Sequence, residues 1–148
     1  MEVRSRRVFC TSLCALAAAA ALPGQAQTPN GGAKGPDPQP LKTTDVTRAQ
    51  MPPGKVLDFR RLGAFYLLAD DKGVFALTAV CTHRGCLVLS EGAAGFGCPC
   101  HDSAYNLQGE VTEGPAKRPL RHLSVKEVTP KGPLQVDIST TVPSDTRL

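Results

Sequence analysis

Short apolar stretches separated by polar turns make up the chain from residue 55 onward. The stretches cover residues 55–62, 64–69, 74–80, 122–128 and 134–138. Their lengths suit β-strands, and none of them continues into the 3.6-residue period of a long amphipathic helix. The pattern therefore predicts an all-β, antiparallel domain with short strands and functional loops.

One hairpin is predicted by strong local signals. The sequence Asp-Asp-Lys-Gly at residues 70–73 separates two dense apolar stretches, so residues 64–80 should fold back on themselves. Further turn signals stand at residues 91–95, 108–109 and 131–133. The folded domain is expected to span residues 46–142, followed by a short tail at residues 143–148.

The amino-terminal part has a different pattern. An apolar run covers residues 8–22 and follows Ser-Arg-Arg-Val-Phe at residues 5–9, which is a twin-arginine pattern. Residues 1–26 are therefore predicted to be a twin-arginine export signal, with an ordinary secretory leader as the alternative. The run is short against the roughly 20 apolar residues of a membrane span, which favours cleavage over retention as an anchor. Export would place the domain on the outer, periplasmic face of a bacterial inner membrane, anchored or peripheral.

Composition predicts a linker and argues against a nucleic-acid partner. Residues 27–45 are rich in proline, glycine and polar residues and predict a flexible linker. The net charge is only +4 over 148 residues, with no Trp and two Tyr. A nucleic-acid partner needs a basic face and a matching motif, so the sequence argues against one.

Two short boxes carry the candidate chemistry: Cys-Thr-His-Arg-Gly-Cys at residues 81–86 and Cys-Pro-Cys-His-Asp-Ser at residues 98–103. A Cys2His2 set can be assembled from them as Cys81, His83, Cys98 and His101. A structural zinc site also uses Cys and His at short spacing, but it leaves the second cysteine of each box unexplained. A disulfide framework would use the cysteines and leave both histidines idle.

The boxes resemble those of the Rieske 2Fe–2S protein family, over residues 80–120. The resemblance implies one 2Fe–2S cluster. Two thiolates, from Cys81 and Cys98, would bind its inner iron. Two imidazoles, from His83 and His101, would bind its outer iron.

The same resemblance implies the surroundings of the cluster. A disulfide between Cys86 and Cys100 would tie the two loops together, within a small antiparallel β-sandwich or barrel-like domain. Ser103 and Tyr105 stand where high-potential members carry hydroxyls that hydrogen-bond to cluster sulfurs. Gly-Pro-Ala at residues 114–116 would form a loop over the cluster.

The chain departs from the family pattern at three places. Arg84 is charged where quinol-oxidising members carry an apolar residue. Asp102 replaces a frequent glycine, and Lys117 and Arg118 precede a proline that usually follows the Gly-Pro-Ala loop directly. These departures leave the cluster ligands unchanged and concern how the protein docks.

By resemblance, the function is high-potential one-electron transfer, as the iron–sulfur subunit of a quinol:cytochrome c oxidoreductase. The implied partners are a quinol, contacted by His101, a membrane cytochrome b and a cytochrome c-type acceptor. Membrane association would come through the amino terminus or the complex. The first alternative is a small electron-transfer subunit of another exported oxidoreductase, similar to that of arsenite oxidase. The second is a structural zinc-binding module without redox function.

Overall fold

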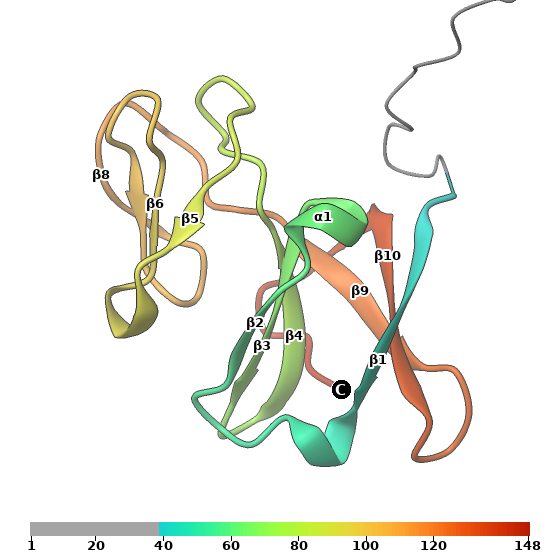
Figure 1. Cartoon of the computed structure of the whole chain (residues 1–148). Helices are drawn as coiled ribbons and strands as arrows, with labels where there is room; N and C mark the ends of the chain where they lie inside the picture. The colour runs from blue at the N-terminus through green and yellow to red at the C-terminus, as the bar shows by residue number, and fades with distance from the viewer. Residues whose placement is uncertain (1–38) are drawn as a thin grey trace, which may run out of the picture. The chain divides into compact units, whose positions relative to one another are not determined.

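A computed structural model describes residues 39–148 as two antiparallel sheets (Figure 1). The larger sheet has six strands in the order β1-β10-β9-β4-β3-β2. Its strands are β1 (Leu41–Thr47), β2 (Val56–Asp58), β3 (Phe65–Asp70), β4 (Gly73–Thr78), β9 (His122–Glu127) and β10 (Pro133–Val142). Every strand pair in both sheets is antiparallel, so the prediction of an all-β antiparallel domain is confirmed.

The smaller sheet has four very short strands and is built from the segment between β4 and β9. Its order is β5-β6-β7-β8. The strands are β5 (Leu89–Ser90), β6 (Phe96–Gly97), β7 (Ala104–Tyr105) and β8 (Val111–Glu113). Since β4 and β9 are themselves hydrogen-bonded neighbours, this segment leaves the large sheet and returns to it, and it forms a lobe of its own (Figure 1).

The predicted hairpin is present as β3 and β4, which pair from Phe65 with Thr78 to Asp70 with Gly73. The Asp70 carboxylate accepts the backbone N–H groups of Lys72 and Gly73 and so closes the turn. Nearly every residue of the two strands is buried, which explains why the stretch is dense in apolar residues instead of alternating.

The hairpin is the common wall of two hydrophobic cores. Tyr66 and Leu77 face a core that continues into the small lobe, where Phe96 and Tyr105 lie. Alternate residues such as Leu67 face a second core, inside the large sheet. Side chains of a strand alternate between its two faces, so a strand covered on both faces is apolar throughout. The small lobe is thus attached to the large sheet by buried side chains, including the Tyr66–Phe96 ring contact at 4.7 Å between centroids.

The stretch 55–62 was expected to be one strand, and this prediction is wrong in its second half. Only β2 is extended; residues 60–63 form a single helical turn, α1 (Arg60–Gly63). The Asp58 carboxylate accepts the backbone N–H of Arg60 at the start of this turn, and Ala64 ends it in the left-handed conformation, with φ of 54°. The turn reverses the chain so that β2 can pair antiparallel with β3.

The predicted linker 27–45 and the domain start at residue 46 also need correction. Residues 41–47 form β1, an edge strand paired with β10. Its inward-facing residues are Lys42 and Thr44, both buried, and the Thr44 hydroxyl donates to the carbonyl of Leu134 at 2.9 Å. Polar residues at the inward positions concealed the strand from a hydrophobicity pattern.

Residues 143–148 are not a loose tail. The backbone of Leu148 pairs with that of Val74 through hydrogen bonds of 2.9 and 3.2 Å. The Arg147 guanidinium pairs with the Asp70 carboxylate at 2.8 Å and lies 3.9 Å from the ring centroid of Phe75. The tail therefore closes against the β3–β4 hairpin.

The predicted export signal at residues 1–26 lies outside the described residues, as does the first part of the predicted linker. Within residues 39–148, no helix is long and apolar enough to cross a membrane.

Candidate functional site

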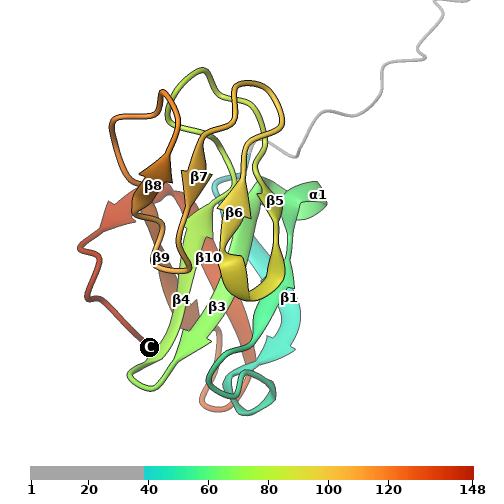
Figure 2. The same cartoon turned by 90° about the vertical axis from the view of Figure 1, so that its left-hand side faces the viewer.

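The two sequence boxes fold into two loops of the same design, side by side at one end of the domain (Figure 2). In the first loop the N–H of Cys81 donates to the carbonyl of Cys86, and the N–H of Gly85 donates to the carbonyl of Cys81. The second loop repeats this closure. The N–H of Cys98 donates to the carbonyl of Ser103, and that of Asp102 donates to the carbonyl of Cys98. Each loop is thus six residues long and closed by its own backbone.

The fifth residue of each loop is left-handed. Gly85 has φ of 79° and Asp102 has φ of 53°. Glycine adopts this conformation without strain, and aspartate is among the few other residues that tolerate it. Asp102 can therefore stand where a glycine is frequent, and the loop keeps its shape.

The loops bring the predicted ligand residues together as two pairs, one of thiols and one of imidazoles. Cys81 and Cys98 are free thiols, buried at 2% and 4% exposure in the core shared with the large sheet, and their side chains share a hydrogen bond. The rings of His83 and His101 meet edge to face, with 4.7 Å between centroids. The two sulfurs thus lie on the inner side of the loops, and His101 is exposed at the end of the domain.

Two observations indicate that this set can hold a metal group. The Nδ1 atoms of His83 and His122 are buried and have no hydrogen-bond partner among the described residues. Only the ring of His83 meets a second histidine, His101, which singles out its Nδ1. A buried polar atom normally has a hydrogen-bond partner, so this nitrogen is available as a ligand. Two thiols in an apolar core, neither of them in a disulfide, provide the soft donors that iron and zinc prefer.

The pKa shifts favour the metal-binding form at Cys81 and His83 and oppose it at Cys98. Burial raises the pKa of Cys81, but hydrogen bonds from the Tyr105 hydroxyl and the His83 backbone N–H outweigh it, and the net shift is downward. The pKa of Cys98 is raised by burial and by the neighbouring Cys81 sulfur. The pKa of His83 is lowered, by burial first and then by the charges of His101 and Arg84. Thiolate and neutral imidazole are the forms that bind metal.

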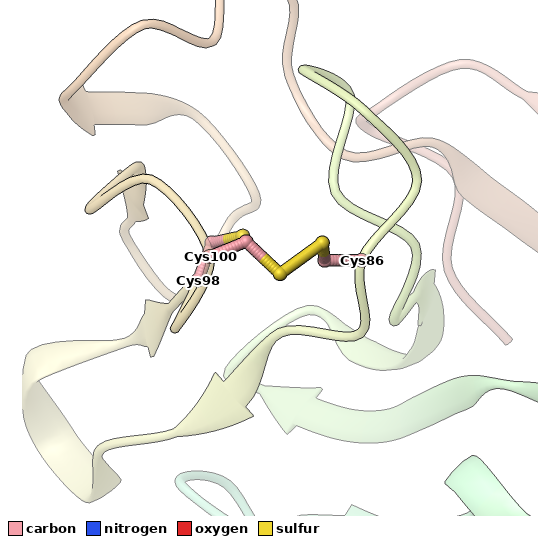
Figure 3. Close-up of side chains that lie close together, drawn as sticks. All are labelled: Cys86, Cys98 and Cys100. Atoms are coloured by element: carbon pink, nitrogen blue, oxygen red, sulfur yellow. A yellow bond between two sulfur atoms is a disulfide. The ribbon is translucent and has the colours of Figure 1, made fainter.

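The second cysteine of each box takes part in the disulfide that the resemblance implied, between Cys86 of the first loop and Cys100 of the second (Figure 3). The sulfur of Cys98 lies within 4.8 Å of both disulfide sulfurs. A disulfide sulfur carries no thiolate charge, so this cluster of three cysteines offers only Cys98 as a thiolate ligand. The role of Cys86 and Cys100 is to hold the loops together.

Tyr105 and Thr82 form a hydrogen-bond network around the Cys81 sulfur. The Tyr105 hydroxyl is 3.2 Å from Cys81 Sγ and accepts the backbone N–H of Thr82 at 3.1 Å. The Thr82 hydroxyl donates to the carbonyl of Arg118 at 2.6 Å, so its proton is not available to Tyr105. The single Tyr105 proton then has two acceptors within reach, the Thr82 oxygen at 3.0 Å and Cys81 Sγ at 3.2 Å. Donation to the sulfur is the charge-assisted bond when Cys81 is a thiolate.

Thr82 is a functional residue that the sequence reasoning missed. It is the second residue of the first box, and nothing in the spacing of Cys and His marks it. Its three hydrogen bonds join the first loop to Tyr105 and to the segment that follows the Gly-Pro-Ala loop.

Ser103 occupies the position expected for the second hydroxyl. It is fully buried, and its oxygen accepts the backbone N–H of Ala116 at 3.2 Å. An accepting hydroxyl retains its proton for donation. Gly114 lies directly against the backbone of Asp102 and Ser103, where any side chain would collide. The Gly-Pro-Ala loop is therefore packed on the second box.

The third histidine of the described segment lies apart from this centre. His122, on β9, stacks on Phe75 with 5.4 Å between ring centroids, and its Nε2 donates to the carbonyl of Gln108 at 3.0 Å. It is a buried residue of the large sheet.

Comparison with known proteins agrees with this geometry. The model of the Rieske [2Fe-2S] domain family matches residues 42–129. The cytochrome b6-f complex iron-sulfur subunit of Gloeobacter violaceus is 44% identical over 68 residues, which cover 43% of this chain and 37% of that protein. The subunit of the same name from Prochlorococcus marinus strain MIT 9515 is 47% identical over 68 residues, 42% of this chain and 38% of that protein. The matched segment therefore spans less than two fifths of these relatives.

A solved structure of hyperthermophilic respiratory complex III contains a chain that is 28% identical. The match covers 66% of this chain and 74% of that one, with a TM-score of 0.48.

Proposed function

The chain belongs to the Rieske [2Fe-2S] domain family, and from this premise we propose that it transfers single electrons as the iron–sulfur subunit of a quinol-oxidising complex. The observation that carries the proposal is the arrangement of two buried free thiols, two edge-to-face imidazoles and a tyrosine hydroxyl on one thiol. The relatives named above are subunits of cytochrome b6-f complexes, which supports the assignment to a quinol-oxidising complex.

We assign the ligands residue by residue. Cys81 and Cys98 supply thiolates from the core, and His83 and His101 supply imidazoles from the middle of the two loops. When bound, the 2Fe–2S cluster supplies one-electron redox chemistry, at a potential raised because two neutral imidazoles replace two thiolates.

The exposed ring of His101 is the proposed contact with the quinol. A ligand histidine keeps one ring nitrogen free, and that nitrogen can bind a proton or accept a hydrogen bond. His101 reaches solvent, so it is the residue we expect to contact the quinol hydroxyl and accept its proton. A cytochrome b in the membrane and a cytochrome c-type acceptor complete the proposed partners, and export through the Arg6–Arg7 signal would place the domain on the periplasmic face.

This proposal predicts a pH-dependent midpoint potential. If a ligand histidine releases a proton on oxidation, the potential falls with rising pH above the oxidised-state pKa, by about 59 mV per pH unit for one proton and one electron. Voltammetry of the purified protein from neutral to alkaline pH measures the slope. A potential below zero that does not change with pH would exclude the quinol role.

The Tyr105 hydroxyl should raise the midpoint potential. We assign it as the donor to Cys81 Sγ, 3.2 Å away. Such a bond stabilises negative charge, which is larger in the reduced state. Burial, followed by the hydrogen bond with Cys81, raises the pKa of Tyr105, so the hydroxyl keeps its proton under the conditions of measurement. Loss of one hydrogen bond worth roughly 0.5–1.5 kcal/mol corresponds to about 20–65 mV for one electron. Tyr105→Phe should therefore lower the potential by that amount in voltammetry.

The chain provides a matched control for this prediction. Tyr66 is equally buried, and its hydroxyl donates to the carbonyl of Val88 at 3.0 Å, not to a sulfur. Tyr66→Phe should leave the potential unchanged. Equal potentials in Tyr105→Phe and the parent protein would contradict the assigned hydrogen bond.

The arsenite-oxidase-like alternative is favoured by one observation, the exposed charge of Arg84 beside His83. Fractionation separates the two functions. A subunit of a quinol-oxidising complex should leave the membrane only with detergent, together with a cytochrome b, whereas the subunit of a soluble enzyme should leave without it.

A further inference from the structure

A groove next to the first loop gathers three arginines and no carboxylate. It has a volume of about 390 Å³ and is lined by residues 80–85, Arg118, Pro119 and Arg121. The residues 80–85 include His83 and Arg84. We call it the basic groove. Positive charge is thus concentrated beside one of the assigned imidazole ligands.

The charge of the basic groove is not neutralised within the described residues. The side chains of Arg84, Arg118 and Arg121 are exposed. The ion pairs found in residues 39–148 involve other arginines, Arg60 and Arg147. Arg121 makes a weak hydrogen bond of 3.4 Å to the hydroxyl of Thr141, which is uncharged.

The groove is held in a defined position relative to the centre. The carbonyl of Arg118 accepts the Thr82 hydroxyl, and Thr82 in turn contacts Tyr105, whose hydroxyl lies on Cys81. Two residues further on, Leu120 is buried, and its N–H donates to the carbonyl of Gly109. The arginines therefore project from backbone that is fixed to the site, and a preorganised surface costs less to bind.

A second groove along the other loop carries the opposite charge. It has a volume of about 300 Å³, is lined by residues of β5, β6 and the second box, and contains Glu91, Asp102 and Glu113. This end of the domain is therefore electrically asymmetric. Such a surface orients a charged partner during encounter.

We propose that the basic groove is the docking site for an acidic face of the protein that accepts electrons from this domain. The inference rests on the proposed function. In the docked state one electron would pass from the reduced centre, on its His83 side, to a metal centre of the partner. This domain is oxidised by one electron, and the oxidation state of the partner's metal centre falls by one. An anionic membrane is the weaker candidate, because a broad negative surface would also meet the acidic groove.

The test compares two double variants with the same change in net charge. Arg118→Glu with Arg121→Glu reverses the groove. Lys55→Glu with Lys126→Glu reverses two exposed lysines outside it. The reduced holoprotein is mixed in a stopped-flow instrument with an acidic plastocyanin or with a basic mitochondrial cytochrome c, at about 0.01 M and 0.1 M ionic strength, where the screening length falls from about 30 to about 10 Å.

We expect the parent protein to react faster with plastocyanin and to lose rate as salt is added. At low salt the rate constant of the groove variant should be lower by a factor of about ten or more, which is within the range of electrostatic steering. The rate constant of the lysine variant should fall by a factor of about two at most. Anisotropy of a fluorescent hexaglutamate peptide gives a readout without electron transfer, and the groove variant alone should lose binding.

Several outcomes would overturn the proposal. Equal losses in both double variants would mean that only total charge matters. A faster reaction with the basic cytochrome would mean that electron transfer uses a surface other than the basic groove. Loss of binding to phosphatidylglycerol vesicles in the groove variant, with electron transfer unchanged, would assign the groove to a membrane. Iron and sulfide content is measured in every sample: a parent protein without the cluster would refute the proposed function itself.

Discussion

Replacing His83 by alanine is expected to abolish the visible absorption of the 2Fe–2S cluster. The reason is geometric. His83 and His101 are the pair of imidazoles in the middle of the two loops. The buried Nδ1 of His83 has no hydrogen-bond partner among the described residues. With one imidazole missing, an iron lacks a ligand that no neighbouring side chain supplies. Purified protein should then contain no stoichiometric iron or sulfide, and His101→Ala should behave in the same way.

Two further variants make this result interpretable. His122→Asn changes the third histidine, which bonds to Gln108 and lies away from the loops; it should retain full iron content at some loss of stability. His83→Cys restores a ligand but adds negative charge. It should hold the cluster at a potential lower by hundreds of millivolts, because thiolate-only clusters have potentials near −400 mV. Full iron in His83→Ala, or loss of iron in His122→Asn, would contradict the assignment of ligands.

The second large effect is expected from the disulfide. Cys86→Ser combined with Cys100→Ser removes a bond that closes a segment of 14 residues. In the chain-entropy account such a loop stabilises the folded state by about 3 kcal/mol. The double variant should lose about that much free energy of unfolding and should release iron faster, because the loops then depend on their short backbone closures alone.

The measurement is denaturation by guanidinium chloride, followed by circular dichroism and by cluster absorption, together with the rate of iron transfer to a chelator. Changing both cysteines at once avoids a free thiol that could ligate or mispair. An unchanged rate of iron release would show that the bond is not needed to hold the loops, whatever its effect on stability.

Local sequence determined much of this protein. The β3–β4 hairpin could be predicted because its turn and its apolar strands lie within fourteen consecutive residues. The two boxes could be recognised because each loop is closed by hydrogen bonds within six residues, so the spacing of Cys and His is a local property. The pairing of Cys86 with Cys100 was implied by family resemblance and is confirmed by the structure.

Other features were decided only by the tertiary structure. Strand β1 turns Thr44 inward because the distant carbonyl of Leu134 accepts a hydrogen bond from its hydroxyl. The carboxyl-terminal segment packs on the hairpin because Arg147 meets Asp70, which lies 77 residues earlier. Thr82 gains its role from Tyr105 and Arg118, and Arg84 shares a groove with Arg118 and Arg121. Hydrophobic periods and turn signals report contacts between near neighbours, whereas these contacts join residues far apart in the chain, and only the folded backbone brings them within reach.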